Sequence, residues 1–309
     1  MTQVTRAFTL NQEHIQMHIV LHAGAHCTDD SRLLKTLFKN RAEFSERGIS
    51  MPRPRHYRQL LTATVRALSK RSASPDSRMA FLDAVLETDP EGVDRVIMHS
   101  ESFFCVPKIA ISKGRLYPKA GPRMAHLNNL FDTDQVELFL GIRNPATFLP
   151  AVYASTPHTS FVDFIDGSDP RDLRWSDLIE DIRTEAPAVN ITVWCNEDTP
   201  LIWGELIREM AGLSPADPVK GAYDLLGEIM SKEGMDRFAS YLETHPDMTE
   251  VQTRRVITAF LDKFALEDMV EEEFDLPGWT ESLMTELTEQ YEEDIYEISR
   301  MQGVTLIAP

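Results

Sequence analysis

The sequence lacks the features that mark membrane, secreted and disulfide-stabilised proteins. It contains no run approaching the roughly 18 apolar residues of a membrane helix, and residues 1–14 lack the apolar core of a secretory signal. It has only three cysteines among 309 residues, and they are too few and too far apart in sequence to form a disulfide framework. We therefore expect a cytoplasmic protein with reduced thiols and no membrane association.

Positive charge is also scarce. The net charge is −18, so a general partnership with nucleic acid is excluded because phosphate backbones repel such a surface. The charge is unevenly spread: residues 32–71 carry eleven Lys/Arg against two Glu, and residues 221–300 carry twenty-one Asp/Glu against six Lys/Arg. Either the two segments neutralise one another, or the basic segment attracts an anionic ligand and the acidic one offers a surface to a protein partner.

What the sequence does contain is apolar content and a regular alternation of strand and helix patterns. Hydrophobic residues make up 42% of the chain, which is enough for a large core. Strands alternating with amphipathic helices are typical of a parallel sheet in an α/β fold. We expect an α/β core over residues 1–214 and an acidic helical C-terminal region over residues 215–309, packed on the same core, with a last strand at 303–307. The four core strands are predicted at 18–21, 94–100, 136–142 and 190–195.

The segment 17–40 reads as strand, tight loop and helix, and it is the first candidate site. Gly24 lies among small residues where a Cβ would obstruct close backbone approach, and the polar residues 28–31 supply helix-start chemistry. A helix that follows a strand directly points backbone N–H groups and its positive dipole end at one place, as phosphate-binding loops do. The loop has no lysine, however, and Asp29 and Asp30 would each oppose a phosphate about 5 Å away by roughly 1 to 3 kcal/mol. The alternative is that the two aspartates simply satisfy the helix N-terminus.

Two further residues follow predicted strands. Glu101 comes just after the second strand and Arg143 directly after the third, and the carboxyl ends of parallel strands are where open α/β sheets hold ligands. A guanidinium placed there can bind a phosphate with two hydrogen bonds. Arg143 also fits an ordinary exposed position in the turn before Pro145.

Taken together, these residues resemble the sulfotransferases that use 3′-phosphoadenosine 5′-phosphosulfate (PAPS), especially bacterial members. That family begins with a strand, a loop of the form PKTGTT or HKTGTT, and a helix, and HAGAHCTDDS falls on this loop. Its second signature is an arginine after a core strand, followed by Asp-Pro, which Arg143-Asn144-Pro145 partly matches. The resemblance implies a P-loop-like parallel sheet flanked by helices.

The chain departs from the family where the chemistry is done. Cys27 stands in the place of the lysine that stabilises the transferring sulfonate, and Asp29 and Asp30 replace a glycine and a threonine that wrap the 5′-phosphate. The position eight after Arg143 holds Ala151 instead of a serine. The resemblance therefore implies PAPS binding that is weak or lost. The cofactor contacts it implies are Gly24, His26, Cys27, Thr28, Ser31 and Arg143, of which Thr28, Ser31 and Arg143 carry over cleanly.

Two functions remain open. In the first, the protein is a sulfotransferase-like enzyme with an unknown small-molecule or carbohydrate acceptor, and Glu101 is the catalytic base with His99 as its rival. In the second, it is a catalytically silent binding or regulatory protein. We predict no metal site, because the cysteines and histidines near the strand ends (Cys27, Cys105, Cys195, His22, His26 and His99) match no short zinc motif.

Overall fold

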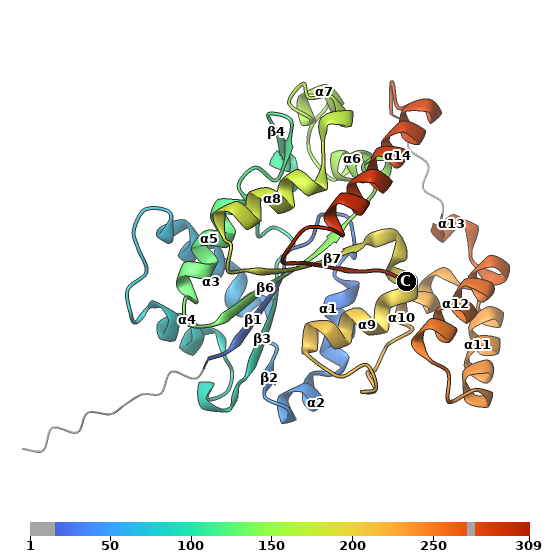
Figure 1. Ribbon diagram of the computed structural model, residues 1–309, viewed down its shortest axis with the longest axis horizontal. Coiled ribbons are helices and arrows are strands. Elements are labelled where there is room, and N and C mark those ends of the chain that lie inside the picture. Colours follow the sequence, from blue (N-terminus) through green and yellow to red (C-terminus); the bar gives the residue numbers. More distant parts are fainter. Residues whose placement is uncertain (1–15, 271–275) are drawn as a thin grey trace, which may run out of the picture.

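A six-stranded, fully parallel sheet forms the centre of the protein in the computed structural model, which describes residues 16–270 and 276–309 (Figure 1). The strand order is β2-β3-β1-β6-β7-β8. The strands are β1 His18–His22, β2 Ile49–Ser50, β3 Arg95–His99, β6 Gln135–Ile142, β7 Asn190–Cys195 and β8 Val304–Ile307. The predicted α/β class and the predicted last strand are confirmed.

Both faces of the sheet are covered, which explains why its strands are apolar throughout instead of alternating. On β1, Ile19 and Leu21 pack into one core and Val20 packs into the other. All three side chains are fully buried. The strand pattern in the sequence thus follows directly from a sheet with no solvent-facing side.

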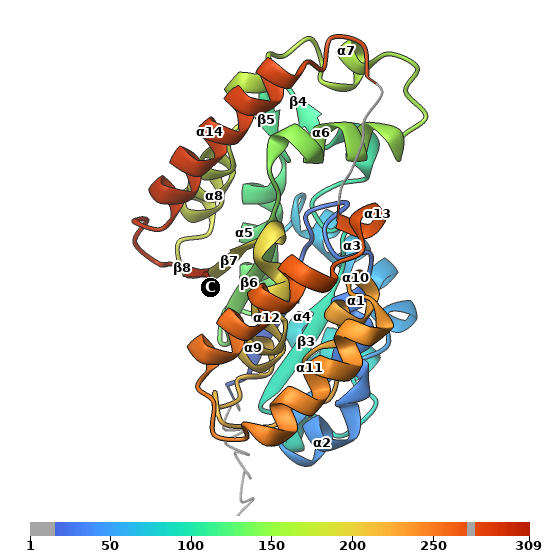
Figure 2. The ribbon, with the colours of Figure 1, turned by 90° about the vertical axis from the view of Figure 1, so that its right-hand side faces the viewer.

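The helices divide between the two faces (Figures 1 and 2). One core is closed by α1 Arg32–Lys39, α2 Arg41–Glu46 and α9 Thr199–Ala211. The other is closed by α3 Pro54–Leu68, α4 Ser77–Val85, α5 Ala120–Leu130, α6 Pro145–Ala154, α8 Trp175–Glu185 and α14 Glu281–Ile298. Smaller elements on this second side are the antiparallel pair β4 Ile111–Ser112 and β5 Arg115–Leu116, and α7 Phe161–Phe164.

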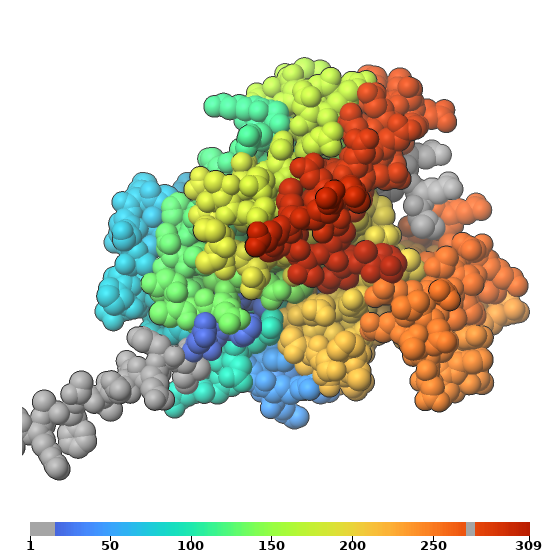
Figure 3. Space-filling model, viewed as in Figure 1, coloured from blue at the N-terminus to red at the C-terminus, as the bar shows by residue number. Residues whose placement is uncertain are grey.

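The C-terminal region is split across the molecule. A separate small apolar cluster joins α10 Asp224–Ile229, α11 Lys232–Thr244 and α12 Glu250–Phe264, and α13 Glu267–Val270 follows. These helices bulge from one side (orange in Figure 3), while α14 packs on α6 and α8, and β8 pairs with β7. Residues 215–309 therefore contribute both to the sheet and to its covering layer. Amphipathic spacing over residues 223–242 predicts one continuous helix. That prediction is wrong, because Met230 adopts an extended backbone and Ser231 caps a new helix.

The loop after β1 lies where the connections change direction. From β1 the chain passes to β2 and β3 on one side of the sheet, and then crosses to β6 on the other side of β1. A ligand crevice forms at such a switch point, outside the carboxyl ends of the strands. The sequence of residues 1–16 has a single apolar cluster and predicts a loose arm or an edge strand; all of these residues except Gln16 lie outside the described part of the chain. Among the described helices, none has the length and apolar character needed to cross a bilayer.

Candidate functional site

The loop between β1 and α1 is held by the strands around it. The N–H of Ala23 donates to the carbonyl of Phe139 at 3.2 Å, and that of Ala25 donates to the carbonyl of Gly141 at 2.8 Å. Gly24 has φ +108°, and a Cβ there would lie 3.3 Å from the nitrogen of His26 and 3.5 Å from the carbonyl oxygen of Glu101. Glycine at this position therefore allows the loop to pass close to the segment after β3, as the sequence predicts.

Asp29 occupies the N-terminus of α1. Its Oδ2 accepts the N–H of Leu33 at 3.1 Å, and its side chain is buried. Burial raises the pKa of Asp29. Asp30 is exposed and pairs with Arg32, so it does not cap the helix. The alternative interpretation of the loop, in which both aspartates satisfy the helix N-terminus, therefore holds for Asp29 and not for Asp30. The carboxylate of Asp29 lies where a bound anion would contact the helix.

Ser31 turns away from the helix that it precedes. Its backbone is left-handed, with φ 60°, and its side chain makes no capping hydrogen bond. Instead its hydroxyl donates to Oε1 of Glu101 at 2.8 Å. Thr28 likewise faces the loop itself, because its hydroxyl donates to the carbonyl of Ala25 at 2.8 Å. Ser31 and Thr28 are both predicted cofactor contacts. In the structure Ser31 binds Glu101, the predicted base, and Thr28 closes its own loop.

Arg143 supports the loop from β6. Its Nη1 donates to the carbonyl of Cys27 at 2.5 Å and its Nε to the hydroxyl of Thr147 at 3.0 Å. The residue is buried, and the indole of Trp175 donates to its carbonyl at 2.8 Å. The alternative of an exposed arginine is therefore wrong, since the guanidinium is folded against the loop backbone.

Glu101 lies at the junction of the loop and β3. Its Oε1 is 3.2 Å from Nε2 of His99 and also accepts from Ser31. The hydrogen bond to His99, with that from Ser31, lowers the pKa of Glu101 to about 2 even though partial burial opposes the shift. The side chain is thus a firmly ionised carboxylate at neutral pH, which makes it a weak proton acceptor.

Glu101→Gln should change how stability responds to acid. The pKa of this carboxyl is about 2 in the folded protein against 4.5 as its ordinary value, so its contribution is fully present above about pH 4.5 and disappears as pH falls toward 2. We expect wild type to be more stable than Glu101→Gln at pH 7 and the difference to shrink below pH 4.5. Urea unfolding followed by circular dichroism between pH 3 and 7 measures it, and a constant difference across that range would contradict the assigned pKa.

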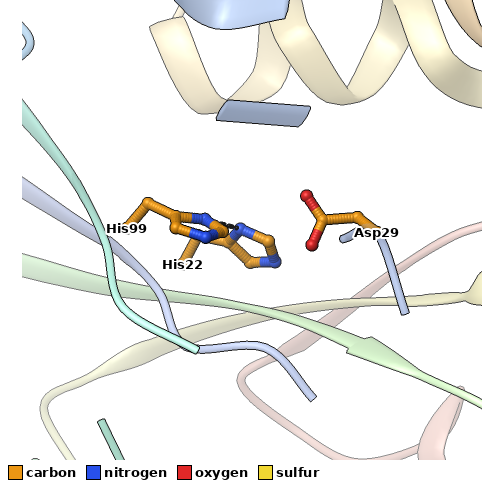
Figure 4. Close-up of side chains that lie close together, drawn as sticks. All are labelled: His22, Asp29 and His99. Carbon is orange, nitrogen blue, oxygen red and sulfur yellow. Dashed lines mark hydrogen bonds between the residues drawn. The ribbon is translucent and has the colours of Figure 1, made fainter. Parts of the chain in front are cut away.

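His22 and His99 end neighbouring strands and are paired in register. Their Nδ1 atoms are 2.7 Å apart, and both rings are buried (Figure 4). Burial, with the proximity of His99, lowers the pKa of His22 well below its usual value. Tyr57 of α3 clamps the backbone of His99, accepting its N–H at 2.6 Å and donating to its carbonyl at 2.9 Å. His99, the alternative to Glu101 as catalytic base, is therefore a buried side chain held by Tyr57.

His26 and the cysteines do not join this cluster. His26 stacks on Tyr117 and its Nδ1 is 2.8 Å from the tyrosine hydroxyl. Burial raises the pKa of the Cys27 thiol. It raises the pKa of the Cys105 and Cys195 thiols to about 12, so all three cysteines are protonated at neutral pH. Within residues 16–270 and 276–309, the group of three or more side chains able to share a metal is His22, Asp29 and His99, with no thiol. The sequence predicts that His22 and His99 lie near strand ends. It does not predict that Asp29 lies beside them, because the seven-residue separation of His22 and Asp29 matches no metal-binding motif.

A cavity of about 460 Å³, here called the loop pocket, opens beside the loop. Four carboxylates border it, those of Asp29, Asp30, Glu197 and Glu228, against two guanidiniums. Arg32 is already paired with Asp30 and Glu228, and Arg143 is bound to the loop. The residues present do not fit the phosphates of PAPS, because negative charge outweighs positive charge and Asp29 fills the helix N-terminus.

A second cavity of about 780 Å³, here called the α3 groove, lies on the other side of Glu101. It is bordered by Glu101 with its two flanking serines and by four cations of α3 and the following turn: Arg58, Arg66, Lys70 and Arg71. Nη2 of Arg58 is buried with no hydrogen-bond partner. Among the described residues, Arg66, Lys70 and Arg71 form no ion pair. Arg58 and Arg66 lie on α3 and Lys70 and Arg71 lie in the turn after it, and the fold brings all four to one groove with Glu101.

Compared with known proteins, the chain matches no protein-family model and no curated protein.

Proposed function

We propose that the protein is a sulfotransferase-like α/β protein with weakened phosphonucleotide binding, and that it acts by binding an anionic small molecule or carbohydrate in the α3 groove. The observation that carries the proposal is the set of cations along that groove without carboxylate partners. The acidic helices α11 and α12 lie on the opposite side of the molecule from α3 (Figure 1) and do not neutralise it. By contrast, two of the three cations of α1 are neutralised, since Arg32 pairs with Glu228 and Lys39 pairs with Asp224.

The unpartnered nitrogen of Arg58 supports an anionic ligand independently. A buried guanidinium N–H without an acceptor costs free energy, and a carboxylate or sulfate oxygen in the groove would satisfy it. Arg58 is also fixed in place, because its Nε donates to the carbonyl of His99 at 3.0 Å. The Glu101 carboxylate at the end of the groove would repel an anion nearby, so the ligand's charges are expected along α3.

Charge reversal in the groove tests this proposal. Arg66→Glu/Arg71→Glu should weaken binding of a sulfated oligosaccharide at least about 10-fold, since each charge contact is worth about 1 kcal/mol at 4 Å in water and reversal turns attraction into repulsion. Isothermal titration calorimetry at two salt concentrations measures the affinity, which should fall with salt in wild type. Lys232→Glu/Arg237→Glu on α11 is the matched control and should change little. Equal losses in both variants, or no binding by wild type, would refute the groove as the site.

Residual sulfonate transfer is the second candidate, favoured by the position of Glu101 between the loop and the groove. As catalytic base, Glu101 would take the acceptor's hydroxyl proton, but its pKa of about 2 and the missing loop lysine predict slow turnover. If any transfer is detected, Glu101→Gln should abolish it while the circular dichroism spectrum stays unchanged. Turnover equal to wild type in this variant would remove Glu101 from the catalytic role.

A protein partner remains part of the silent interpretation. Val251 on α12 and Met269 on α13 are exposed apolar side chains among the acidic helices. We propose that a partner, if present, contacts this side of the molecule. The cytoplasm stays the predicted compartment, consistent with three free thiols.

A further inference from the structure

Three electron-pair donors meet in one buried place between the two cavities. His22 comes from the end of β1, His99 from the end of β3 and Asp29 from the loop, and Figure 4 shows the carboxylate facing the paired rings. One ligand atom from each side chain lies within 4.8 Å of the others. All three residues are at most 6% exposed.

This cluster contains more hydrogen-bond acceptors than hydrogen-bond donors. The Glu101 carboxylate can only accept, so Nε2 of His99 carries the proton that faces it, and with both imidazoles neutral Nδ1 of His99 is a bare acceptor. Nδ1 of His22 must then donate across the 2.7 Å contact, which leaves Nε2 of His22 without a proton. That nitrogen and Oδ1 of Asp29 are both buried with no hydrogen-bond partner. Two unpartnered acceptors in one buried site are costly. A cation bound by the two Nδ1 atoms would displace the proton between them to Nε2 of His22, and it would give the Asp29 carboxylate a positive partner.

We propose that His22, His99 and Asp29 form a binding site for a divalent transition-metal ion of the zinc type. Two imidazoles and a carboxylate are a ligand set that zinc accepts, with water in the fourth position. Glu101 then supports the site from outside, since its hydrogen bond to Nε2 of His99 orients the ring so that Nδ1 faces the metal. The inference does not depend on the proposed function.

The geometry requires a small rearrangement. In a tetrahedral site with bonds of about 2.0 to 2.1 Å, ligand atoms lie about 3.3 Å apart, so the two Nδ1 atoms would separate by about 0.6 Å and the carboxylate would approach by up to about 1.5 Å. Rotation of the Asp29 side chain supplies that movement at the cost of its hydrogen bond to Leu33. Asp29 borders the loop pocket, which gives water a route to the fourth position.

The local charge also suits a divalent cation. Asp29 and Glu101 together supply two negative charges against a buried metal. The two carboxylates balance the charge of a divalent ion, and Arg58, on the carbonyl side of His99, adds one further positive charge. A cation held here would place positive charge beside the loop pocket, in a loop whose own sequence has no lysine.

Metal titration of the full-length, chelator-treated protein tests the proposal. We expect calorimetry to show one Zn²⁺ per chain, and Co²⁺ to give visible absorption bands without the intense bands of sulfur ligation, because no thiol belongs to the set. Glu101→Gln should weaken zinc binding by about 10- to 100-fold, and Asp29→Asn and His99→Gln by more, since they remove ligands.

Two matched controls separate this site from surface binding. Asp30→Asn removes the neighbouring loop carboxylate and His245→Gln removes an exposed histidine, and neither should alter the affinity. If His99→Gln fails to fold, Asp29→Asn still decides the question, because the asparagine oxygen can keep the hydrogen bond to Leu33. No stoichiometric binding by wild type, or the same affinity in Asp29→Asn as in Asp30→Asn, would overturn the proposal.

Discussion

Asp134→Ala is expected to lower the free energy of unfolding by about 3 to 5 kcal/mol, the usual cost of removing one member of a buried ion pair. The Asp134 side chain is fully buried and that of Arg78 is 8% exposed. Nε and Nη2 of Arg78 donate to its two oxygens at 2.6 and 2.7 Å, and the N–H of Met17 donates to Oδ1 at 2.9 Å. One carboxylate therefore ties α4 to the starts of β1 and β6, and its loss removes the negative charge and the two hydrogen bonds that Asp134 provides to a buried guanidinium.

Urea unfolding followed by circular dichroism measures this effect. Asp132→Ala is the matched control, because Asp132 is exposed two residues away and its loss should matter by no more than about 0.5 kcal/mol. Arg78→Met/Asp134→Leu should recover part of the stability, since two apolar side chains leave no unpaired charge. A loss below about 1 kcal/mol for Asp134→Ala would show that the pair is not buried as described.

Asp29→Asn/Asp30→Asn is expected to strengthen binding of adenosine 3′,5′-bisphosphate at least about 30-fold. Each carboxylate opposes a phosphate about 5 Å away by roughly 1 to 3 kcal/mol, so removing two charges gains about 2 kcal/mol or more. Neutralising Asp30 also frees Arg32 from one of its two partners in the loop pocket. Asparagine keeps the shape of the side chain and its capping capacity, which limits the cost to α1.

Isothermal titration calorimetry in buffer containing a chelator measures this gain without a contribution from metal. Asp83→Asn/Asp132→Asn makes the same change in net charge at two exposed positions and should leave the affinity unchanged. Because burial raises the pKa of Asp29, wild-type binding should also strengthen as pH falls, and the double variant should lack this response. If the variant binds no better than wild type, loop charge is not what weakens the nucleotide site.

Local pattern predicted the elements because each strand is apolar enough to be buried on both faces. The strand predicted at 190–195 has the same bounds as β7, and the one at 136–142 differs from β6 by a single residue. The position of Glu101 and Arg143 at the carboxyl edge also followed from chain order alone, since parallel strands all end on one side. The α/β class of the fold could therefore be predicted from the sequence.

Tertiary structure alone decided what these residues do. Ser31 reads as a helix cap, yet its left-handed backbone sends its hydroxyl to Glu101, 70 residues away. Arg143 reads as a ligand for an external phosphate, but it binds the carbonyl of Cys27.

The two buried pairs also could not be predicted from the sequence. Arg78 and Asp134 are 56 residues apart, and His22 and His99 are 77 apart, so no local spacing links either pair. Pairing of β1 with β3 brings His22 beside His99, and packing of α4 beside the start of β6 brings Arg78 to Asp134. Burial then strengthens the interactions of these charges and lone pairs. Sequence periodicity determines which face of an element is buried, but the partner across the core depends on how the elements pack, which is why the fold could be predicted and the contacts within the site could not.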